Sequence, residues 1–419
     1  MRLMVLAASV AVVLVGVGCG GASESETSAS TPTPTQTAEQ AQGRWVIRDL
    51  GAGPATVGIL INDRGQVVWH RADTWDPSGN EAHEFPVAFF WWNGRSAELT
   101  LGGYGSGAYA INERGQVVGD SENKTGDYHA FLWQNGKIRD LGTLGGTGGY
   151  PDSSAHAINE RGQVVGSALT GATFRRGGVT YHSSHAFLWQ RGKMRDLGTL
   201  GGPDSEAVAI NERGQVVGWA DTRATDKDGD PIPHAFLSQN GKMRDLGTLG
   251  GPSSRATTIN ERGQVIGSAD TKAKDEYGDP IEHAFFWENG KMTDLGAFRA
   301  SGINDRGQIV GTSAERPVHT NGFLWQNGTM RDLGVLSDPF DINERGQVVG
   351  SCYTSEFGSR ACLWQSGEIT GLGALPGGNG SGPYDINERG QGSVGVTPRP
   401  AYSMPSSGRT SPDADQQMP

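Results

Sequence analysis

Three carboxylates alternate along one short segment and suggest metal chemistry. Within residues 226–230 the acids are Asp226, Asp228 and Asp230, and their oxygens suit the hard cation Ca²⁺. The glycine of this segment falls two residues too early for an EF-hand loop, and the matching segment 275–279 keeps only two of the three acids. The alternative to a calcium site is a solvated acidic turn, and we expect no other cofactor.

Two cysteines near the end of the chain have the spacing of a disulfide between neighbouring strands. Cys352 and Cys362 fall at the end of one expected strand and within the next. In adjacent antiparallel strands they would lie roughly opposite each other. An exported protein permits this bond, which a chain-entropy estimate values at about 2 to 3 kcal/mol. Two buried free thiols are the alternative.

The start of the chain has the features of an export signal. A charged Arg2 precedes the apolar run 3–17, which is short for a membrane span. The segment 15–19 resembles the lipobox of bacterial lipoproteins, in which the cysteine becomes the lipid-modified N-terminus. We therefore expect residues 1–18 to be a signal peptide and Cys19 to carry a lipid that anchors the exported protein at the cell surface or periplasmic face. A plain signal peptide is the alternative.

No set of residues in the sequence matches a known catalytic motif. There is no nucleophile elbow, no glycine-rich phosphate loop between a strand and a helix, and no Cys/His metal cluster. We therefore expect no catalytic residue and no enzyme. Two acids from distant repeats can still meet at one axis, which leaves a polysaccharide hydrolase or lyase open.

One variable segment carries a candidate contact patch. Phe174, Arg175, Arg176 and Tyr181 lie within residues 168–184, which differ in length and sequence from the equivalent segments of other repeats. Loops that vary on a rigid scaffold commonly carry binding specificity. A longer solvated loop is the alternative.

Composition restricts the elements that can position these residues. The 419 residues include 65 Gly and 20 Pro, which suit short strands joined by turns better than helices. Lys and Arg number 35 against 46 Asp and Glu, a net charge of −11, and no basic run is present to follow a phosphate backbone. We therefore expect an all-β protein that binds no nucleic acid.

A repeated turn motif organises the chain. The motif Ile-Asn-x-Arg-Gly-Gln recurs at spacings of 39 to 52 residues, with its asparagine at Asn62, Asn112, Asn159, Asn211, Asn260, Asn304, Asn343 and Asn387. A second motif, Ala-Phe-Leu-Trp-x-Asn-Gly-Lys, lies between these copies and is fullest at residues 130–142. Because Asn-Gly is a strong signal for a two-residue hairpin, each unit supplies two hairpins and four short antiparallel strands.

Four strands in a unit of about 45 residues predict a β-propeller, with an open solenoid of stacked hairpins as the alternative. Residues 44–51 copy the last strand of a unit and residues 384–396 copy a first hairpin, so the two ends can form one shared blade. We favour eight blades over residues 44–396, with seven as the alternative. Residues 19–43 are expected to form a disordered tether and 397–419 a disordered or degenerate tail.

Residues that recur in every unit are best explained by the fold. We expect the asparagine, arginine and glutamine of the first turn, and the aspartate of Asp-Leu-Gly, to hold blades together or to satisfy turn backbone. His129, His185, His234 and His283 share one position in the repeat. A closed ring places them on separate blades, so they are not expected to bind one metal ion.

The recurring segments resemble those of a known family. The two motifs, together with Asp-Leu-Gly-Thr-Leu-Gly-Gly at Asp140, Asp196 and Asp245, are similar to the extracellular HAF-repeat family of bacterial proteins. The resemblance covers about residues 44–396 and implies export and a propeller-like fold. It brings no activity with it.

These observations predict an exported, lipid-anchored surface propeller that works as a monomer. We expect a non-catalytic binding or scaffold module for a protein, peptide or glycan, which contacts the membrane only through the lipid on Cys19. The alternatives are an exported polysaccharide hydrolase or lyase with a site at the propeller axis, and a purely structural envelope protein.

Overall fold

The computed structural model describes residues 11–15, 37–39, 45–50, 56–71, 86–148, 151–176, 178–313, 321–354, 358–373 and 378–398. This part of the chain consists of strands and turns without a helix, as the Gly and Pro content predicts. It therefore also holds no helix that is long and apolar enough to cross a membrane. Cys19 lies outside the described residues.

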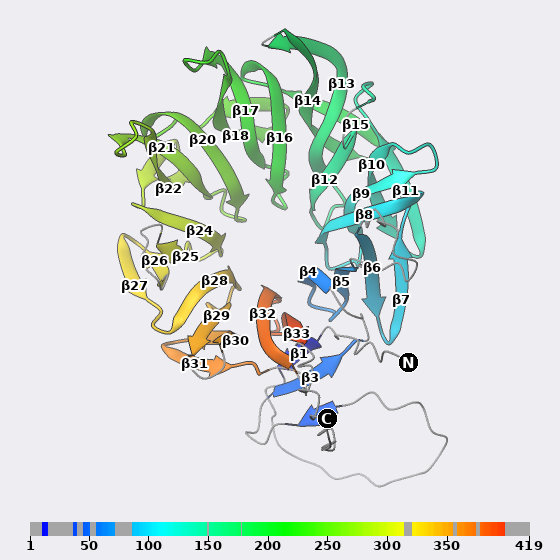
Figure 1. The fold of residues 1–419 in the computed structure, drawn as a ribbon, viewed down its shortest axis with the longest axis vertical. Helices are drawn as coiled ribbons and strands as arrows, with labels where there is room; N and C mark the ends of the chain where they lie inside the picture. The colour runs from blue at the N-terminus through cyan, green and yellow to red at the C-terminus, as the bar shows by residue number, and fades with distance from the viewer. Residues whose placement is uncertain are drawn as a thin grey trace, which may run out of the picture.

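Seven four-stranded antiparallel sheets form a ring of blades around a central axis, with the first strand of each blade nearest the axis (Figure 1). Blades 1 and 2 consist of β4 (Thr56–Ile61), β5 (Val67–Arg71), β6 (Val87–Trp92) and β7 (Arg95–Leu99), then β8 (Gly102–Ile111), β9 (Val117–Asn123), β10 (Tyr128–Gln134) and β11 (Lys137–Gly142). Blades 3 and 4 consist of β12 (Ser153–Ile158), β13 (Val164–Arg176), β14 (Val179–Gln190) and β15 (Lys193–Gly198), then β16 (Gly201–Ile210), β17 (Val216–Thr225), β18 (Pro231–Gln239) and β19 (Lys242–Asp245).

The remaining blades follow the same plan. Blade 5 consists of β20 (Gly250–Ile259), β21 (Val265–Lys274), β22 (Pro280–Glu288) and β23 (Lys291–Asp294). Blades 6 and 7 consist of β24 (Phe298–Ile303), β25 (Ile309–Ser313), β26 (Gly322–Gln326) and β27 (Thr329–Asp332), then β28 (Leu336–Ile342), β29 (Val348–Thr354), β30 (Gly358–Gln365) and β31 (Glu368–Gly371). The predicted all-β propeller is confirmed, and its seven complete blades match the count given as the alternative.

A five-stranded antiparallel sheet, which we call the closing sheet, fills the gap between blades 7 and 1. Its strand order is β32 (Gly378–Ile386), β33 (Gly392–Pro398), β1 (Ala11–Val15), β3 (Trp45–Asp49) and β2 (Thr37–Glu39). The predicted last-strand copy and the C-terminal hairpin thus share one sheet. They are not neighbours in it, because β1 pairs with β33 on one side and with β3 on the other.

The hairpin turns have the backbone geometry that their sequence requires. Asn135 and Gly136 have φ angles of 51° and 76°, and two positive φ values in a row define the type I′ turn that the Asn-Gly pair predicts. In the first turn of each unit the glycine closes the turn, as where Gly115 N–H donates to Asn112 O at 2.9 Å with φ of 70°.

The core lies between blades rather than within one. Eight apolar clusters lie between neighbouring blades or between a blade and the closing sheet. The phenylalanine of the second motif is buried in blades 2 to 5, at Phe131, Phe187, Phe236 and Phe285. Burying such a ring stabilises the fold by about 1.5 to 3 kcal/mol. The recurring glycine of the second strand lets the first strand approach: a Cβ on Gly119 would lie 1.9 Å from Gly107 O.

The propeller has two different faces. In each blade tight hairpins join the first strand to the second and the third to the fourth, and both end on the same side because the strands are antiparallel. We call this side the turn face. The opposite side, which carries the hairpins between second and third strands, is the loop face.

Candidate functional site

A ring of asparagines on the turn face joins every blade to the next. Asn211 shows the pattern: its Oδ1 accepts hydrogen bonds from Arg213 N at 3.1 Å and Gln215 N at 3.0 Å. Its Nδ2 donates to Gln215 Oε1 at 2.8 Å and to Asn260 O, in the next blade, at 3.0 Å. The asparagine and glutamine therefore satisfy turn backbone and join neighbouring blades, as the repeat predicts.

The acid after each asparagine forms a second ring with the same role. Glu212 N–H donates to Glu261 Oε1 at 2.8 Å, and Glu261 N–H donates to Asp305 Oδ1 at 2.7 Å. Burial raises the pKa of Glu261, with the neighbouring acids adding to the effect. These carboxylates bind main-chain amides of the preceding blade, so we assign them to the fold rather than to a ligand site.

Each of the four recurrent histidines pairs with an aspartate of its own blade. The histidine Nδ1 lies 2.8 to 3.0 Å from a carboxylate oxygen in the pairs His129–Asp140, His185–Asp196, His234–Asp245 and His283–Asp294. They lie on four blades, as predicted. A base held by a carboxylate is two thirds of a hydrolytic triad, but within the described residues none of these histidines hydrogen-bonds to a serine or cysteine.

The acids of the predicted calcium segment do not converge. Asp226 Oδ1 accepts hydrogen bonds from Asp228 N at 2.9 Å and Asp230 N at 2.8 Å, and the bond from Asp230 lowers the pKa of Asp226. Asp230 instead pairs with Arg176 of blade 3. In the described ranges no group of three or more His, Cys, Asp or Glu side chains is placed to hold a metal ion. The segment forms a hydrogen-bonded acidic turn, and calcium binding there stays a prediction.

The predicted contact patch forms one end of a long hairpin and meets that acidic turn. Phe174 and Tyr181 lie opposite each other on β13 and β14, with ring centroids 5.5 Å apart. Arg175 donates to Gly178 O at 3.1 Å, while Arg176 forms the ion pair with Asp230. Two candidate sites that the sequence left separate are therefore in contact on the loop face.

A groove that the sequence did not indicate lies next to this contact, between the long hairpins of blades 4 and 5. We call it the 4–5 groove; its volume is about 680 Å³. Its lining comes from three elements: the β17–β18 hairpin, the first half of β20, and the β21–β22 hairpin. The lining residues are Asp226, Lys227, Pro231, Ile232, Pro233, Pro252, Ser253, Arg255, Asp270, Lys274, Tyr277, Gly278, Asp279 and Pro280.

Charges of both signs are held in place in the groove. The Arg255 guanidinium lies over the Trp219 ring, 4.4 Å from its centroid, which orients the cation. Asp270 Oδ2 accepts hydrogen bonds from Ser253 N at 3.1 Å and Ser253 Oγ at 2.6 Å. On the rim, the Tyr277 side chain is 82% exposed, so a large aromatic surface faces solvent beside these charges.

A buried acid beside the groove responds to pH. Burial, together with the charge of nearby Asp204, raises the pKa of Asp221 to about 6, while Arg255 opposes the shift. Asp204 N–H also donates to Asp221 Oδ2 at 3.3 Å. Asp221 therefore gains its negative charge beside Arg255 at a pH where most other carboxyls are already ionised.

Cys352 and Cys362 are joined by a disulfide across β29 and β30, with their Cα atoms 5.9 Å apart. Both side chains are buried in the cluster between blades 6 and 7. The bond is far from the groove and supports the fold of one blade.

Comparisons with known proteins find structural neighbours. No family model matches the chain, and no curated protein matches it either. The β-propeller domain of the Trilobed protease from Pyrococcus furiosus, with an open velcro topology, is 10% identical, with a TM-score of 0.50 over 77% of this chain and 96% of that one. A prolyl endopeptidase structure is 9% identical, with a TM-score of 0.51 over 76% of this chain and 49% of that one. A Mycobacterium tuberculosis puromycin-hydrolyzing peptidase is 12% identical, with a TM-score of 0.47 over 76% and 53%.

These neighbours correct the predicted function. The leading assignment, a non-catalytic binding or scaffold module, is corrected, because the two structures with TM-scores of 0.50 and 0.51 come from a protease and a prolyl endopeptidase. The chain spans about half the length of the prolyl endopeptidase and of the puromycin-hydrolyzing peptidase. At this identity the likeness shows the fold alone, and the resemblance to the HAF-repeat family stays a prediction.

Proposed function

We propose that this propeller takes part in peptide hydrolysis by selecting the peptide, which it holds in the 4–5 groove. The observation that carries the proposal is the groove itself. Its volume of about 680 Å³ lies in the range of ligand-binding clefts, which is roughly 300 to 1,000 Å³. In the groove the Ser253 hydroxyl donates to Asp270 at 2.6 Å and not to a histidine base, so the proposal places the bond-breaking groups outside the described residues.

The groove chemistry matches a short peptide with free ends. Arg255, fixed over Trp219, suits the terminal carboxylate, because a guanidinium donates two parallel hydrogen bonds to it. Asp270, on the same lining, suits the terminal amine. A neutral oligosaccharide would bring no opposite charge to either group, so their desolvation would be costly.

The groove walls suit an extended chain. Pro231 and Pro233 on one side and Pro280 on the other give the walls little freedom to move. Ile232 and the exposed Tyr277 offer apolar surface for peptide side chains. Aromatic residues of this kind carry much of the binding energy in protein recognition.

The structural neighbours support the choice of ligand class by analogy of fold. Two of the similar solved structures, with TM-scores of 0.50 and 0.51, are named as a protease and an endopeptidase. Because one fold serves many functions, the ligand class has to be inferred from the groove residues and not from the fold.

Calorimetric titration of the full chain with tetrapeptides tests the binding step. Peptides with free ends should bind, and acetylated, amidated versions should bind at least tenfold more weakly. Arg255→Gln and Tyr277→Ala should each weaken binding, while Tyr104→Ala should not, since Tyr104 is equally exposed, at 83%, but lies outside the groove. Equal affinity for capped peptides, or an equal effect of all three substitutions, would overturn the groove assignment.

Affinity capture from the native cells tests the link to hydrolysis. Captured full chain should bring with it an activity that releases amino acids from the same tetrapeptides. Capture of the Arg255→Gln variant should bring the same activity with a higher KM. A captured chain without any peptide hydrolysis would remove the peptidase role, whatever the titration shows.

A further inference from the structure

Three consecutive blades present paired cations at the rim of the turn face. The fourth strands of blades 2, 3 and 4 each begin with Lys-x-Arg directly after the turn, and all six side chains are exposed. We call them the cationic belt: Lys137, Arg139, Lys193, Arg195, Lys242 and Arg244. The blades are joined by the same asparagine bonds, so the three pairs lie at equivalent heights on the disc.

The belt is not neutralised by neighbouring acids. The aspartate that follows each pair lies toward the loop face and is bound to a histidine, as in His129–Asp140 and His185–Asp196. Within the described residues no ion pair joins a belt residue to a carboxylate. In a chain with a net charge of −11, this is a local excess of positive charge.

The arginines nearer the axis do not add to that excess. Each first turn carries one exposed arginine, but each also carries one acid of the second ring. Some of these arginines reach a carboxylate, as in Arg114–Glu160 at 3.9 Å and Arg262–Glu288 at 3.8 Å. The unbalanced charge of the turn face therefore lies at the rim, where the exposed Arg191 in the turn before Lys193 adds to the belt.

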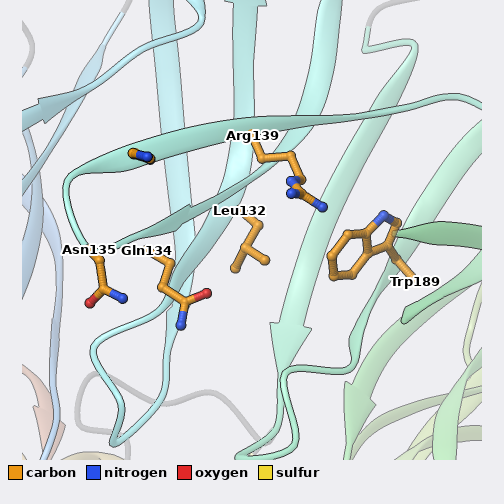
Figure 2. A pocket seen from close by; sticks show the side chains of 6 residues that line it. Leu132, Gln134, Asn135, Arg139 and Trp189 are labelled. Carbon is orange, nitrogen blue, oxygen red and sulfur yellow. The ribbon is translucent and has the colours of Figure 1, made fainter. Parts of the chain in front are cut away.

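A crevice opens within the belt, between blades 2 and 3 (Figure 2). Its volume is about 580 Å³, and its lining consists of Leu132, Gln134, Asn135, Lys137, Arg139 and Trp189. The lining has two cations, two carboxamides and an indole, and no carboxylate. Figure 2 shows the Arg139 guanidinium extending toward Trp189, whose ring centroid is 5.9 Å away.

The same pairing recurs between blades 4 and 5, where Arg244 lies over Trp287 at 5.4 Å. An arginine held against an indole keeps its orientation while its outer N–H groups stay available. Guanidinium groups in this state bind phosphate oxygens through two hydrogen bonds, and lysine adds a point charge.

We propose that the turn face of blades 2 to 4 binds the phosphate groups of anionic phospholipids at a membrane surface. A membrane is favoured over a single soluble phosphate because the six cations are spread across three blades, and a surface can meet all of them at once. Each cation close to an anionic bilayer contributes on the order of a fivefold gain in binding. The 4–5 groove lies on the opposite face and stays open.

Vesicle sedimentation of the full chain tests the proposal, with Cys19→Ser to exclude a lipid anchor. The protein should bind phosphatidylcholine vesicles that contain phosphatidylglycerol, and not pure phosphatidylcholine. Neutralising the first four belt residues to glutamine should lower the partition coefficient by about two to three orders of magnitude. The matched control neutralises four exposed cations of the loop face, Lys124, Arg175, Arg223 and Lys272, and should bind as the unsubstituted chain does.

Further measurements keep the test decisive. Thermal melting of both variants shows whether they fold. If the belt variant does not fold, a salt titration of the unsubstituted chain takes its place as the test. Added salt must then weaken the binding of the chain to anionic vesicles steeply. Glycerol phosphate should compete with the vesicles. Equal loss in the control variant, binding that ignores salt, or tight binding of soluble polyphosphate without any binding of vesicles would overturn the proposal.

Discussion

Asn387 donates a hydrogen bond from its side-chain amide to the main-chain oxygen of Asn62, at 2.8 Å and across 325 residues of chain. The same bond joins neighbours elsewhere in the ring, as from Asn211 to Asn260 at 3.0 Å. The last repeat therefore meets the first through the contact used at every other junction. The asparagine ring is closed with eight members although the complete four-stranded blades number seven.

Removing the amide at the closing junction should cost as much as removing it inside the ring. Asn387→Ala and Asn211→Ala each delete the bond to the next blade and leave two turn amides without their acceptor. A loss of about 2 to 3 kcal/mol is expected for each, measured by urea unfolding. A much milder effect of Asn387→Ala would mean that the closing sheet, and not the asparagine ring, holds the ends together.

The sequence predicts the fold well because the fold repeats. One turn motif appears eight times, and its asparagine needs both its own turn and the next blade to satisfy its polar atoms. The place of β1 in the closing sheet was not predictable, because the apolar run 3–17 suits a signal peptide as well as a strand.

The groove escaped prediction for a different reason. Its lining comes from hairpins of two blades, and their approach depends on how each hairpin leans, which no local pattern encodes. Pro231 and Pro280 were visible as a shared Asp-Pro-Ile segment in two repeats, but repetition argued for structure rather than for a site. The contact of Arg176 with Asp230 joins two blades in the same way.

Stability should fall as pH rises through the titration of a carboxyl pair near the axis. Asp341 and Asp385, on the first strands β28 and β32, share a hydrogen bond, and burial raises the pKa of both. The unfolded carboxyls titrate near about pH 4. Above that value the folded pair holds a proton that the unfolded chain has lost, so folding is penalised increasingly until the folded pair ionises.

Asp341→Asn isolates this effect, since the amide can donate to Asp385 without a charge. The variant should be more stable than the unsubstituted chain at neutral pH and should lose less stability between about pH 4 and about pH 7. Asp385 keeps its bonds from Ile61 N at 2.9 Å and Ile386 N at 2.8 Å. Urea unfolding across pH measures the profiles, and two parallel curves would contradict the pairing.

One histidine pair should add stability that is present in acid and absent in base. The hydrogen bond to Asp196 raises the pKa of His185. A histidine whose folded pKa is raised stabilises the fold below its unfolded pKa of about 6.5, and the contribution is lost as pH rises through the folded value. His185→Gln should flatten the unfolding free energy between about pH 6 and about pH 8. An unchanged slope would place the titrating group elsewhere.

Loss of the disulfide should destabilise the protein without affecting its groove. Replacing both Cys352 and Cys362 by serine removes a short cross-link between β29 and β30, at a cost of about 2 to 3 kcal/mol. Dithiothreitol should lower the melting temperature of the unsubstituted chain and leave the double variant unchanged. Peptide affinity should be the same in both, because neither cysteine lines the groove.

Peptide binding should weaken as Asp221 ionises. With a pKa of about 6, this carboxyl is mostly neutral in mild acid and charged at neutral pH, where it partly offsets the charge of Arg255. A peptide carboxylate that relies on Arg255 should therefore bind a few-fold more tightly at about pH 5 than at about pH 7. Asp221→Asn should keep the tighter affinity at both pH values.

C-terminally amidated peptides provide the control, because they carry no carboxylate for Arg255 to hold and should bind equally at both pH values. If the free and amidated peptides showed the same pH profile, Arg255 would not be the group that holds the carboxylate.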